Sequence, residues 1–244
     1  MTKTLIFLII YLLCNTSNAF EWVESHIGGG MVMQENIRRN NKKWWFKDDP
    51  RYQPIPLFLL RFGPWFVDRN GAGMGVIYTD NIRLLGVITY RGEPYKTRGI
   101  AERKRSFYAG GIFKFYAFEF KYYQDLEGIS KGNILKAYYA PRFGQEKEGY
   151  YFTPRLYAEH WNNKYTNYYF GVPNHEATAA GMRNYEAKRA INWGYELRNV
   201  WQYGTFRYFA SAGMKYYDKT VRNSPTVVKG NEYLFFVGLL WKVY

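Results

Sequence analysis

The sequence predicts an all-β protein, a transmembrane antiparallel up-and-down β-barrel of about twelve strands. Three observations predict it. Apolar and polar residues alternate along most of the chain, aromatic residues make up 21% of it, and no long apolar helix follows the N-terminal segment. Alternation with a period of two is typical of strands that have one apolar and one polar face. Aromatic rings are frequent where a protein meets a membrane interface.

The first nineteen residues have the pattern of a secretory signal peptide. Lys3 provides a positive start, residues 5–13 are apolar, and Ser17-Asn18-Ala19 places small residues where a signal peptidase cleaves. We therefore expect residues 1–19 to be removed and residues 20–244 to form the barrel. Cys14, the single cysteine, would leave with the signal, so no disulfide and no cysteine-bound metal is expected.

The chain is strongly basic, with a formal net charge of +14. A basic exported protein attracts anions such as lipid phosphates and murein carboxylates. We therefore expect the lipid and lipopolysaccharide of an outer membrane as partners. Nucleic acid is not expected, because the chain is exported and carries no nucleic-acid-binding motif.

The alternation is clearest in residues 190–203, where Trp193 and Tyr195 share one face while Glu196 and Arg198 share the other. Twelve candidate strands follow from this pattern: 21–34, 54–62, 65–79, 81–91, 106–116, 118–126, 130–143, 150–161, 165–172, 189–203, 205–218 and 231–244. Most are near the ~9–11 residues that a tilted strand needs to cross a bilayer, and their number is even.

A soluble lipocalin-like barrel or β-sandwich would show the same alternation, but it would bury its apolar face. Tryptophans close to the ends of the predicted strands favour the membrane barrel, whose apolar face contacts lipid. These tryptophans are Trp44, Trp45, Trp65, Trp161, Trp201 and Trp241.

The chain ends in FFVGLLWKVY, similar to the closing strand that directs outer-membrane barrels to their assembly machinery. The expected end signal consists of Phe236, Gly238, Trp241, Val243 and Tyr244. We prefer the register that turns Lys242 to the lumen, since a lysine facing hydrocarbon costs a few kcal/mol away from the interface.

Loop lengths predict how the barrel is oriented, with the N-terminus on the periplasmic side. Residues 35–53, 173–188 and 219–230 are expected outside, and the turns at Gly63-Pro64, Asn162-Asn163 and Gly204 inside. The basic segment 92–105 would then be periplasmic, although it is long for a periplasmic turn. There its arginines and lysine could dock an acidic partner or murein.

Inward-facing charges offer two readings of the lumen. The expected lumen residues include Arg155, Glu159, Glu196, Arg198, Arg207 and Lys215. A salt-bridged plug is favoured, because twelve strands leave little spare lumen. An anion-preferring channel is the alternative.

Residues in the last third of the chain resemble the MltA-interacting protein (MipA)/OmpV family of outer-membrane proteins. The resemblance rests on Tyr169, Phe170, Gly171 and Val172, on Ala180-Gly181 and Tyr185 in the following loop, and on Ser224-Pro225 in the last loop. Pro54 and Pro56, which open an early strand, also fit. The middle of the chain is more basic and aromatic than the family pattern, and the acidic run before Ser224 is reduced to Asp218.

The resemblance implies an outer-membrane barrel of a Gram-negative bacterium and no catalytic residues. One family member is a scaffold that joins a lytic murein transglycosylase to a murein synthase, which makes these enzymes the implied partners. A small anion-preferring channel and a surface adhesin acting through the outer loops are the alternatives.

The sequence favours no enzyme, metal or cofactor. His175-Glu176 could be an acid–base pair, but no nucleophile stands at a defined spacing from it. Ser25 and His26 are neighbours on a strand, so their side chains point to opposite faces. The serine and histidine of a lipase would have to lie on the same face. The three histidines are too scattered for a metal site.

Overall fold

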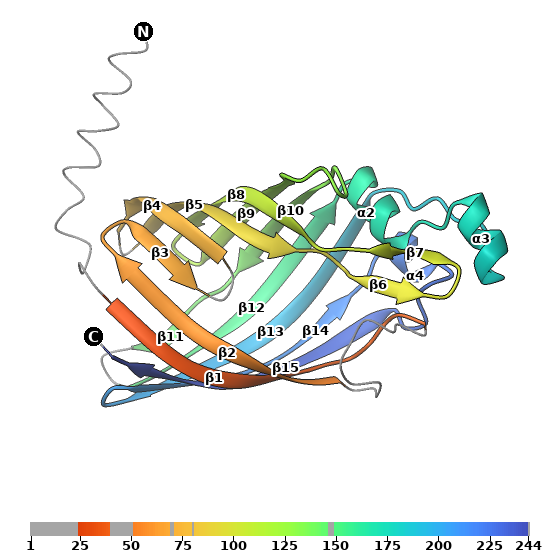
Figure 1. The fold of residues 1–244 in the computed structure, drawn as a ribbon. Helices are drawn as coiled ribbons and strands as arrows, with labels where there is room; N and C mark the ends of the chain where they lie inside the picture. Colours follow the sequence, from red (N-terminus) through yellow and green to blue (C-terminus); the bar gives the residue numbers. More distant parts are fainter. Residues whose placement is uncertain (1–23, 40–50, 69–70, 80, 146–148, 244) are drawn as a thin grey trace, which may run out of the picture.

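A closed antiparallel barrel forms the body of the protein (Figure 1). The computed structural model describes residues 24–39, 51–68, 71–79, 81–145 and 149–243. The main sheet has thirteen strands, and pairing of β10 with β12 closes it. The short β11 pairs, among the described residues, with β12 alone. Twelve strands therefore make the ring, as the sequence predicts.

The ring follows the order of the chain. Its strands are β1 (Glu24–Gln34), β2 (Arg51–Phe62), β3 (Trp65–Asp68), β4 (Gly71–Tyr78), β5 (Ile82–Arg91), β8 (Ser106–Phe115), β9 (Phe118–Asp125), β10 (Asn133–Tyr139), β12 (Tyr150–Trp161), β13 (Ala190–Tyr203), β14 (Phe206–Tyr216) and β15 (Asn231–Lys242). Outside the ring are β6 (Tyr95–Thr97), β7 (Ile100–Arg103), β11 (Phe143–Gln145), α2 (Asn163–Phe170), α3 (Asn174–Ala180) and α4 (Lys219–Arg222).

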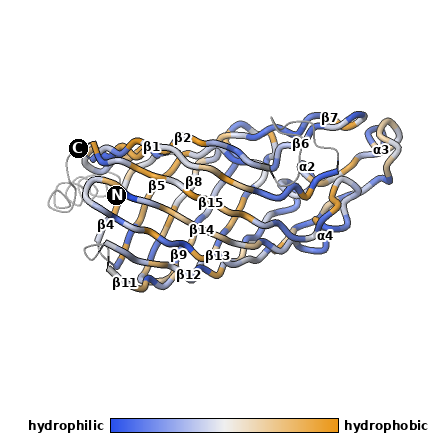
Figure 2. The backbone as a smooth tube through the Cα atoms, turned by 90° about the horizontal axis from the view of Figure 1, so that it is seen from below, coloured by the Kyte–Doolittle hydropathy of each residue, from blue (hydrophilic) through white to orange (hydrophobic). Residues whose placement is uncertain are grey.

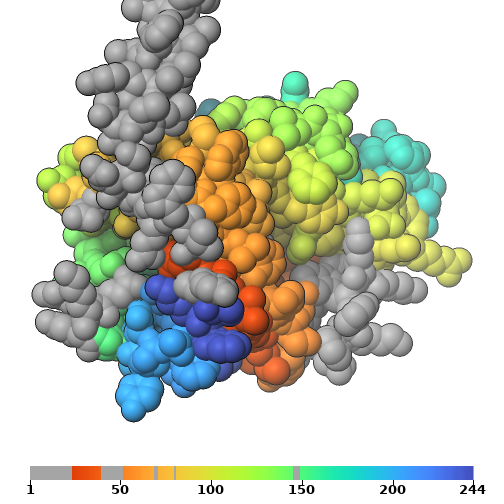
Figure 3. Space-filling model, turned by 60° about the vertical axis from the view of Figure 1, so that its left-hand side comes forward, coloured from red at the N-terminus to blue at the C-terminus, as the bar shows by residue number. Residues whose placement is uncertain are grey.

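The first and last strands close the ring on the other side. β1 pairs antiparallel with β15, from His26 opposite Lys242 to Gln34 opposite Leu234. Figure 3 shows β1 in red directly beside β15 in dark blue. The predicted signal peptide and Tyr244 of the predicted end signal lie outside the described residues.

The barrel has two unlike ends. At one end, here called the turn end, short connections such as Gly63-Pro64 and Gly204-Thr205 join the strands, and β1 begins and β15 ends there (Figure 1). At the other, the loop end, lie the long connections, which include the β6–β7 hairpin and the three helices.

Two of the predicted strands are wrong, and the errors cancel in the count. Residues 65–79 form two strands, β3 and β4, joined where the sequence has Asn70-Gly71, a pair typical of tight hairpins. Residues 165–172 do not form a strand: α2 occupies most of them, and its start at Asn162 lies at the loop end. The turn expected inside at Asn162-Asn163 is therefore also wrong.

The same two errors misplaced the basic segment 92–105. An extra strand before it and a missing strand after it reverse the direction of every strand between them. Residues 92–105 therefore lie at the loop end, beside the helices, and not with the short turns (Figure 1). This removes the reason for a murein-docking role of this segment on the periplasmic face.

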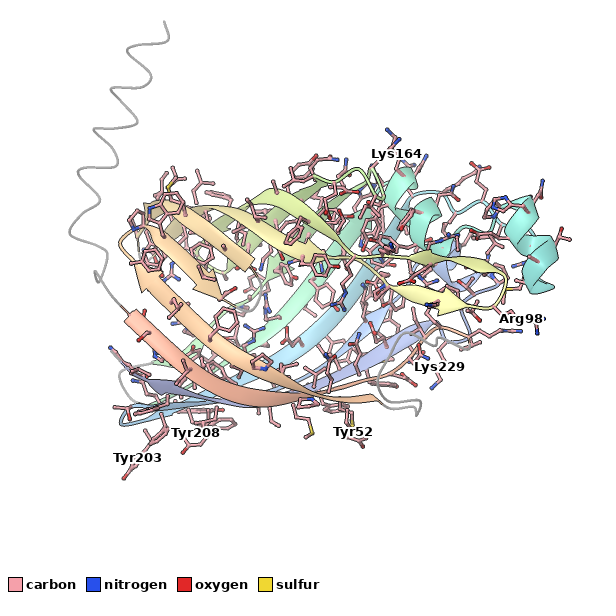
Figure 4. All side chains as sticks on the ribbon, viewed as in Figure 1. Tyr52, Arg98, Lys164, Tyr203, Tyr208 and Lys229 are labelled. Carbon is pink, nitrogen blue, oxygen red and sulfur yellow. The ribbon has the colours of Figure 1, made fainter. Side chains whose placement is uncertain are left out.

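Along the strands, hydropathy alternates between the outer and the inner face (Figure 2). In β13, Trp193 and Tyr195 face outward and are about half exposed. Tyr203 and Tyr208 point away from the barrel at the turn end (Figure 4). Other large apolar side chains exposed on the wall include Ile27, Met31, Leu60, Ile88, Phe113, Phe120, Leu135, Leu156, Ile191, Leu197, Phe235, Val237 and Trp241. A soluble barrel buries its apolar face, whereas a membrane barrel turns this face outward to lipid. The exposed apolar side chains over the wall fit the membrane barrel.

Neighbouring residues of β14 provide a test of this inversion. Ala212 pairs with Leu197 and Phe235 of the outer face, whereas Ser211 pairs with Arg198 of the inner face. We predict that Ala212→Arg lowers the free energy of unfolding by about 2–4 kcal/mol, the cost of an arginine facing lipid near the midplane. Ser211→Arg should change it little. Urea unfolding in phospholipid vesicles, followed by tryptophan fluorescence, measures both, and equal losses would contradict the assigned faces.

Candidate functional site: the plugged loop end and the charged lumen

The loop end of the barrel is filled by a plug built around α2. One face of this helix, with Tyr165, Tyr169 and Phe170, packs against inward-facing residues of the ring. The buried cluster comprises Ile37, Tyr108, Tyr123, Ile134, Trp161, Tyr165, Tyr169, Phe170, Ala187, Ala190, Tyr217, Val221 and Val227. Many of these residues are less than 3% exposed, so the plug is as tightly packed as a protein core.

Local chemistry explains why a helix forms here. The side chain of Asn162 caps its N-terminus by accepting a hydrogen bond from the backbone N–H of Tyr165 at 2.9 Å. Tyr165 and Tyr169 are four residues apart, so they share one helical face. The sequence contained both signals, but the run Tyr168-Tyr169-Phe170 also fits a strand, and its pattern alone did not decide between them.

At its other end, α2 leaves carbonyl groups without partners inside the helix, and three distant side chains bind them. Arg38 Nη2 donates to Tyr169 O at 2.9 Å, Ser224 Oγ donates to Phe170 O at 2.6 Å, and Arg103 Nη2 donates to Gly171 O at 3.3 Å. Cations are favoured at a helix C-terminus because the carbonyl ends carry partial negative charge. These three contacts, which we call the carbonyl clamp, join the first loop, the β6–β7 hairpin and the last loop to α2.

Arg38 is the more buried of the two arginines of the clamp, only 5% exposed. Its guanidinium lies 3.8 Å from the centre of the Phe170 ring, and its Nη1 donates to Thr226 Oγ1 at 2.7 Å. Burial lowers the pKa of Arg38 to about 10, which leaves the side chain charged at neutral pH. The cation–π contact and the hydrogen bonds replace part of the lost hydration.

Arg103 forms the second anchor, through an ion pair with Glu176 of α3. Its Nη1 and Nη2 atoms lie 3.0 and 2.6 Å from the Glu176 carboxylate, and both side chains are less than a tenth exposed. The same carboxylate accepts a hydrogen bond from Ala101 N. Glu176, which the sequence offered as half of an acid–base pair, thus holds the β6–β7 hairpin on α3, while His175 beside it is exposed.

The proposed family-motif residues meet in this plug. Tyr169, Phe170 and Val172 are buried, and Ser224 binds the carbonyl of Phe170. The predicted strand 165–172 would have ended with residues 168–170 at the membrane surface; instead these rings pack in the plug. Val172 pairs instead with Tyr185 through two backbone hydrogen bonds. Pro225, the last motif residue, follows Ser224 and is half-buried.

Below the plug, charged side chains from β9, β12 and β13 form a ladder across the lumen. Glu119 accepts from Lys121 at 2.9 Å and Arg155 at 3.4 Å. Arg155 also binds Glu196 at 3.0 Å, and Glu196 binds Arg198 at 3.2 Å. The structure thus brings together three of the expected lumen charges, Arg155, Glu196 and Arg198.

A second group of charges lies directly under the plug. Glu159, only 3% exposed, bridges Lys136 at 2.7 Å and Lys215 at 2.9 Å. The ammonium group of Lys215 also lies 4.4 Å from the ring centre of Trp161 in the plug. Arg207, the remaining expected lumen charge, also lines the lumen, but nearer the turn end of β14, where it pairs in register with Gln202 and Leu240.

The end-signal residues are divided between the two faces of β15. Trp241 and Val243 are about 40–46% exposed on the outside, whereas Phe236 packs inside against Val32 and Leu57. Gly238 faces Gly30 across the junction of β15 and β1. Glu232 points into the lumen, where it binds Gln34 and Tyr217.

Exposed cations surround the loop end. Figure 4 shows Arg98, Lys164 and Lys229 there. The exposed cations on the described loops and helices of the loop end are Arg39, Lys96, Arg98, Lys104, Arg105, Lys131, Lys164, Arg183, Lys188, Arg189, Lys219 and Arg222. The exposed acids of the same segments are Glu127 and Glu186, so this rim has a strong positive potential.

The histidines and acids of the described residues do not form a metal centre. No three histidine, aspartate, glutamate or cysteine side chains gather in the described part of the chain as a metal site would require. His26 is buried facing the lumen, and His160 pairs with outward-facing Leu135 on a different part of the wall. Among the described helices, none has the length and apolar character needed to cross a membrane.

A closed twelve-stranded ring with an apolar outer wall and a polar, charged lumen defines an outer-membrane β-barrel. Within that class, the family model described as "MltA-interacting protein MipA" matches residues 27–243, nearly the whole chain. The chain therefore belongs to the MipA family. No curated protein matches it in sequence.

Solved structures resemble the chain only distantly. The NanC porin is 10% identical, with a TM-score of 0.41 over 90% of this chain and 100% of its own. Ail, the attachment invasion locus protein of Yersinia pestis, is 11% identical, with a TM-score of 0.26 over 91% of this chain and 99% of its own. OccAB2 of Acinetobacter baumannii is 13% identical, with a TM-score of 0.33 over 93% of this chain and 66% of its own. Likenesses this distant carry no conclusion about function.

The carbonyl clamp leads to a prediction about the plug. Arg38→Met should leave the Tyr169 carbonyl buried without its partner, at a cost of about 1–3 kcal/mol, while the Thr226 hydroxyl keeps its hydrogen bond with Ser224. We expect hydrogen exchange of the amides in residues 163–172 to become faster, with the strands unchanged. Arg39→Met is the matched control, because Arg39 is an exposed neighbour. Equal exchange in the two variants would show that the clamp does not hold α2.

Proposed function

We propose that this chain is a non-enzymatic scaffold in the outer membrane of a Gram-negative bacterium, where it binds a lytic transglycosylase of murein synthesis. The single observation that carries the proposal is membership of a family described by its interaction with MltA, over residues 27–243. The plugged loop end supports it, since a scaffold needs a stable wall and no conducting path. A murein synthase is the second partner proposed, and such a pairing would place the protein in peptidoglycan growth of the cell envelope.

The turn end is the proposed partner surface, facing the periplasm. Murein enzymes work on that side of an outer membrane, and barrels of this class carry short turns there and long loops outside. The cationic rim at the loop end supports the same orientation, because the outer leaflet carries lipopolysaccharide phosphates. Lipopolysaccharide is accordingly the lipid partner proposed for this rim.

An anion-preferring channel is the second candidate, favoured by the excess of cations over acids in the lumen. The ion-pair ladder and the plug argue against it, because paired charges and a packed core leave no continuous water path. An adhesin role of the outer loops has no comparable support, since the described part of these loops is largely folded into the plug.

We predict that the intact protein is silent in a planar bilayer. Replacing residues 163–186 with a short Gly-Ser linker should produce steps of conductance that favour anions, because the basic lumen then opens at the loop end. The same linker inserted between Gly204 and Thr205 keeps the plug and should stay silent. Anion-selective conductance steps from the intact protein would contradict the scaffold function and support the channel function.

Photocrosslinking in intact cells tests the partner and the orientation together. A benzoylphenylalanine at Tyr116 or Thr205 lies at the turn end, and one at Arg98 or Lys164 lies at the loop end. We predict that the turn-end positions capture a lytic transglycosylase, identified by mass spectrometry, and that the loop-end positions do not. No capture from either turn-end position, while the variants fold and reach the membrane, would end the scaffold proposal.

A further inference from the structure

The hydrogen-bonded wall of the barrel has a gap beside the upper half of β2, the half nearer the loop end. β2 pairs with β1 along its whole length, but with β3 only through Leu59–Phe62. β3 has four residues and turns back into β4, whose pairing with β5 ends at Ile88. Among the described residues, none pairs with residues 51–58 of β2 on the side away from β1.

Two prolines in β2 fit this gap. Pro54 and Pro56 pair with Met31 and Gly29 of β1. They are two residues apart, so their backbone nitrogens point to the same side of the strand. A proline has no N–H, and the ladder to β1 is continuous, so the missing donors belong on the open side. Each removes a donor that would otherwise be unpaired in lipid, where such a group costs several kcal/mol. The sequence is thus adapted to an unpaired edge.

The flanks of the gap lie against lipid. Tyr52 and Phe62 of β2 and Ile88 and Tyr90 of β5 are each about half exposed on the outer face. Pro54 and Pro56 are exposed between them. The gap therefore opens sideways into the apolar belt and not into water beyond the membrane.

Behind the gap, one wall of the lumen is apolar, which is unusual for the inside of a membrane barrel. Inward-facing side chains of β1, β2, β14 and β15 line a cavity of about 530 Å³. Its apolar lining consists of Val32, Leu57, Phe58, Leu59, Phe209, Ala210, Leu234, Phe236 and Leu240. The polar side chains that also line it are Gln34, Asp68, Glu196, Arg198, Arg207 and Ser211. Gly238 and Gly30 keep this cavity free, since a Cβ on either would lie within 2.8 Å of the Phe236 ring. Phe58, on the edge of the gap, also lines the cavity.

A second cavity, of about 350 Å³, adjoins the first and is charged. Asp68 and Arg198 line both cavities, so they mark the junction. The second cavity reaches the other flank of the gap at Thr89 and Arg91. Its charged lining is Asp68, Arg91, Glu119, Lys121, Arg155 and Arg198, four cations against two carboxylates.

Arg91 is the cation of this cavity that forms no ion pair with an acidic side chain among the described residues. It donates to the hydroxyl of Tyr123 at 3.1 Å and lies 4.0 Å from that ring, while its Nε is buried without a hydrogen-bond partner. Lys121 and Arg155, by contrast, share Glu119. An anionic group placed in this cavity would find a charge that the ladder does not already neutralise.

We propose that these two adjoining cavities bind an anionic single-chain amphiphile of the membrane, with its acyl chain along the apolar wall and its carboxylate or phosphate near Arg91 and Arg198. The gap between β2 and β5 is the entrance, because the plug closes the loop end and the flanks of the gap contact lipid. A free fatty acid and a lipid of the bilayer share this chemistry. The site is independent of the scaffold role, since it faces the lumen and the side of the barrel.

Photolabelling with a diazirine at the end of a palmitate chain tests the site, with the full protein in phosphatidylcholine nanodiscs. We expect mass spectrometry to find label on the inward-facing Phe209 and Phe236, in addition to the label that lipid contact gives on outward-facing residues such as Phe235 and Val237. Label confined to outward-facing residues would overturn the proposal.

A matched pair of variants tests whether the label reports the cavity. Ser211→Trp places a ring in the larger cavity, whereas Ala212→Trp places it on the outer face of the same strand. Ser211→Trp should reduce inward labelling about tenfold, equivalent to a loss of about 1.4 kcal/mol in binding. Ala212→Trp should leave it unchanged. The shift in gel mobility on heating checks that both variants are folded. Equal labelling in the two folded variants would contradict a lumenal site.

Two further comparisons test the head group and the entrance. Excess palmitate should displace the inward label, and hexadecanol, which has no charge, should displace it far less. Arg91→Gln should remove this difference. Equal competition by palmitate and hexadecanol in the unchanged protein would overturn the proposal that the head group is anionic. Lysophosphatidylglycerol of the bilayer, a single-chain lipid carrying a diazirine on its chain, should also label Phe209 and Phe236. Its failure to label them, while it labels outward-facing residues, would overturn entry from the bilayer through the gap.

Discussion

The structure depends on one constraint, that every backbone N–H and C=O facing lipid needs a partner within the protein. The closed ring meets it by joining β1 to β15 and β10 to β12, so that no long edge remains except beside β2. At that edge Pro54 and Pro56 remove two of the N–H donors that would otherwise need a partner. Alternation follows from the same requirement, because a strand in this wall must show lipid an apolar face and the lumen a polar one.

Inside the ring the constraint is different, since a helix buried in the mouth of the barrel must have its own free carbonyls satisfied. Arg38, Arg103 and Ser224 provide this from three separate loops, so that packing of α2, the hairpin and the last loop becomes one cooperative arrangement. The charges lower in the lumen form ion pairs on one inner wall. The inner wall opposite them consists mainly of apolar side chains. The barrel is therefore closed at one end, charged on one inner wall and apolar on the other.

Several features could be read from the sequence because they repeat along the chain. Period-two alternation predicted the fold class and the two faces of β13 and β14. The helix α2 was missed because a four-residue spacing of tyrosines competes with adjacent aromatics that also suit a strand. Missing α2 and the hairpin at Asn70-Gly71 kept the strand number at twelve but reversed the side assigned to residues 92–105. A correct number of strands therefore identifies the fold class, but it does not ensure that each connection is assigned to the correct end of the barrel.

The sequence by itself determined the class of the protein, the residues of the outer wall and the kinship of the motif around Phe170, because these depend on local periodicity and residue type. Only the tertiary structure decided what the motif does. Phe170, Ser224, Arg38 and Arg103 come from four segments, and nothing in their local patterns requires them to meet. The gap beside β2 and the apolar inner wall also depend on which strands are neighbours and where each one ends. Such pairings arise from long-range contacts, which the order of residues along one strand does not record.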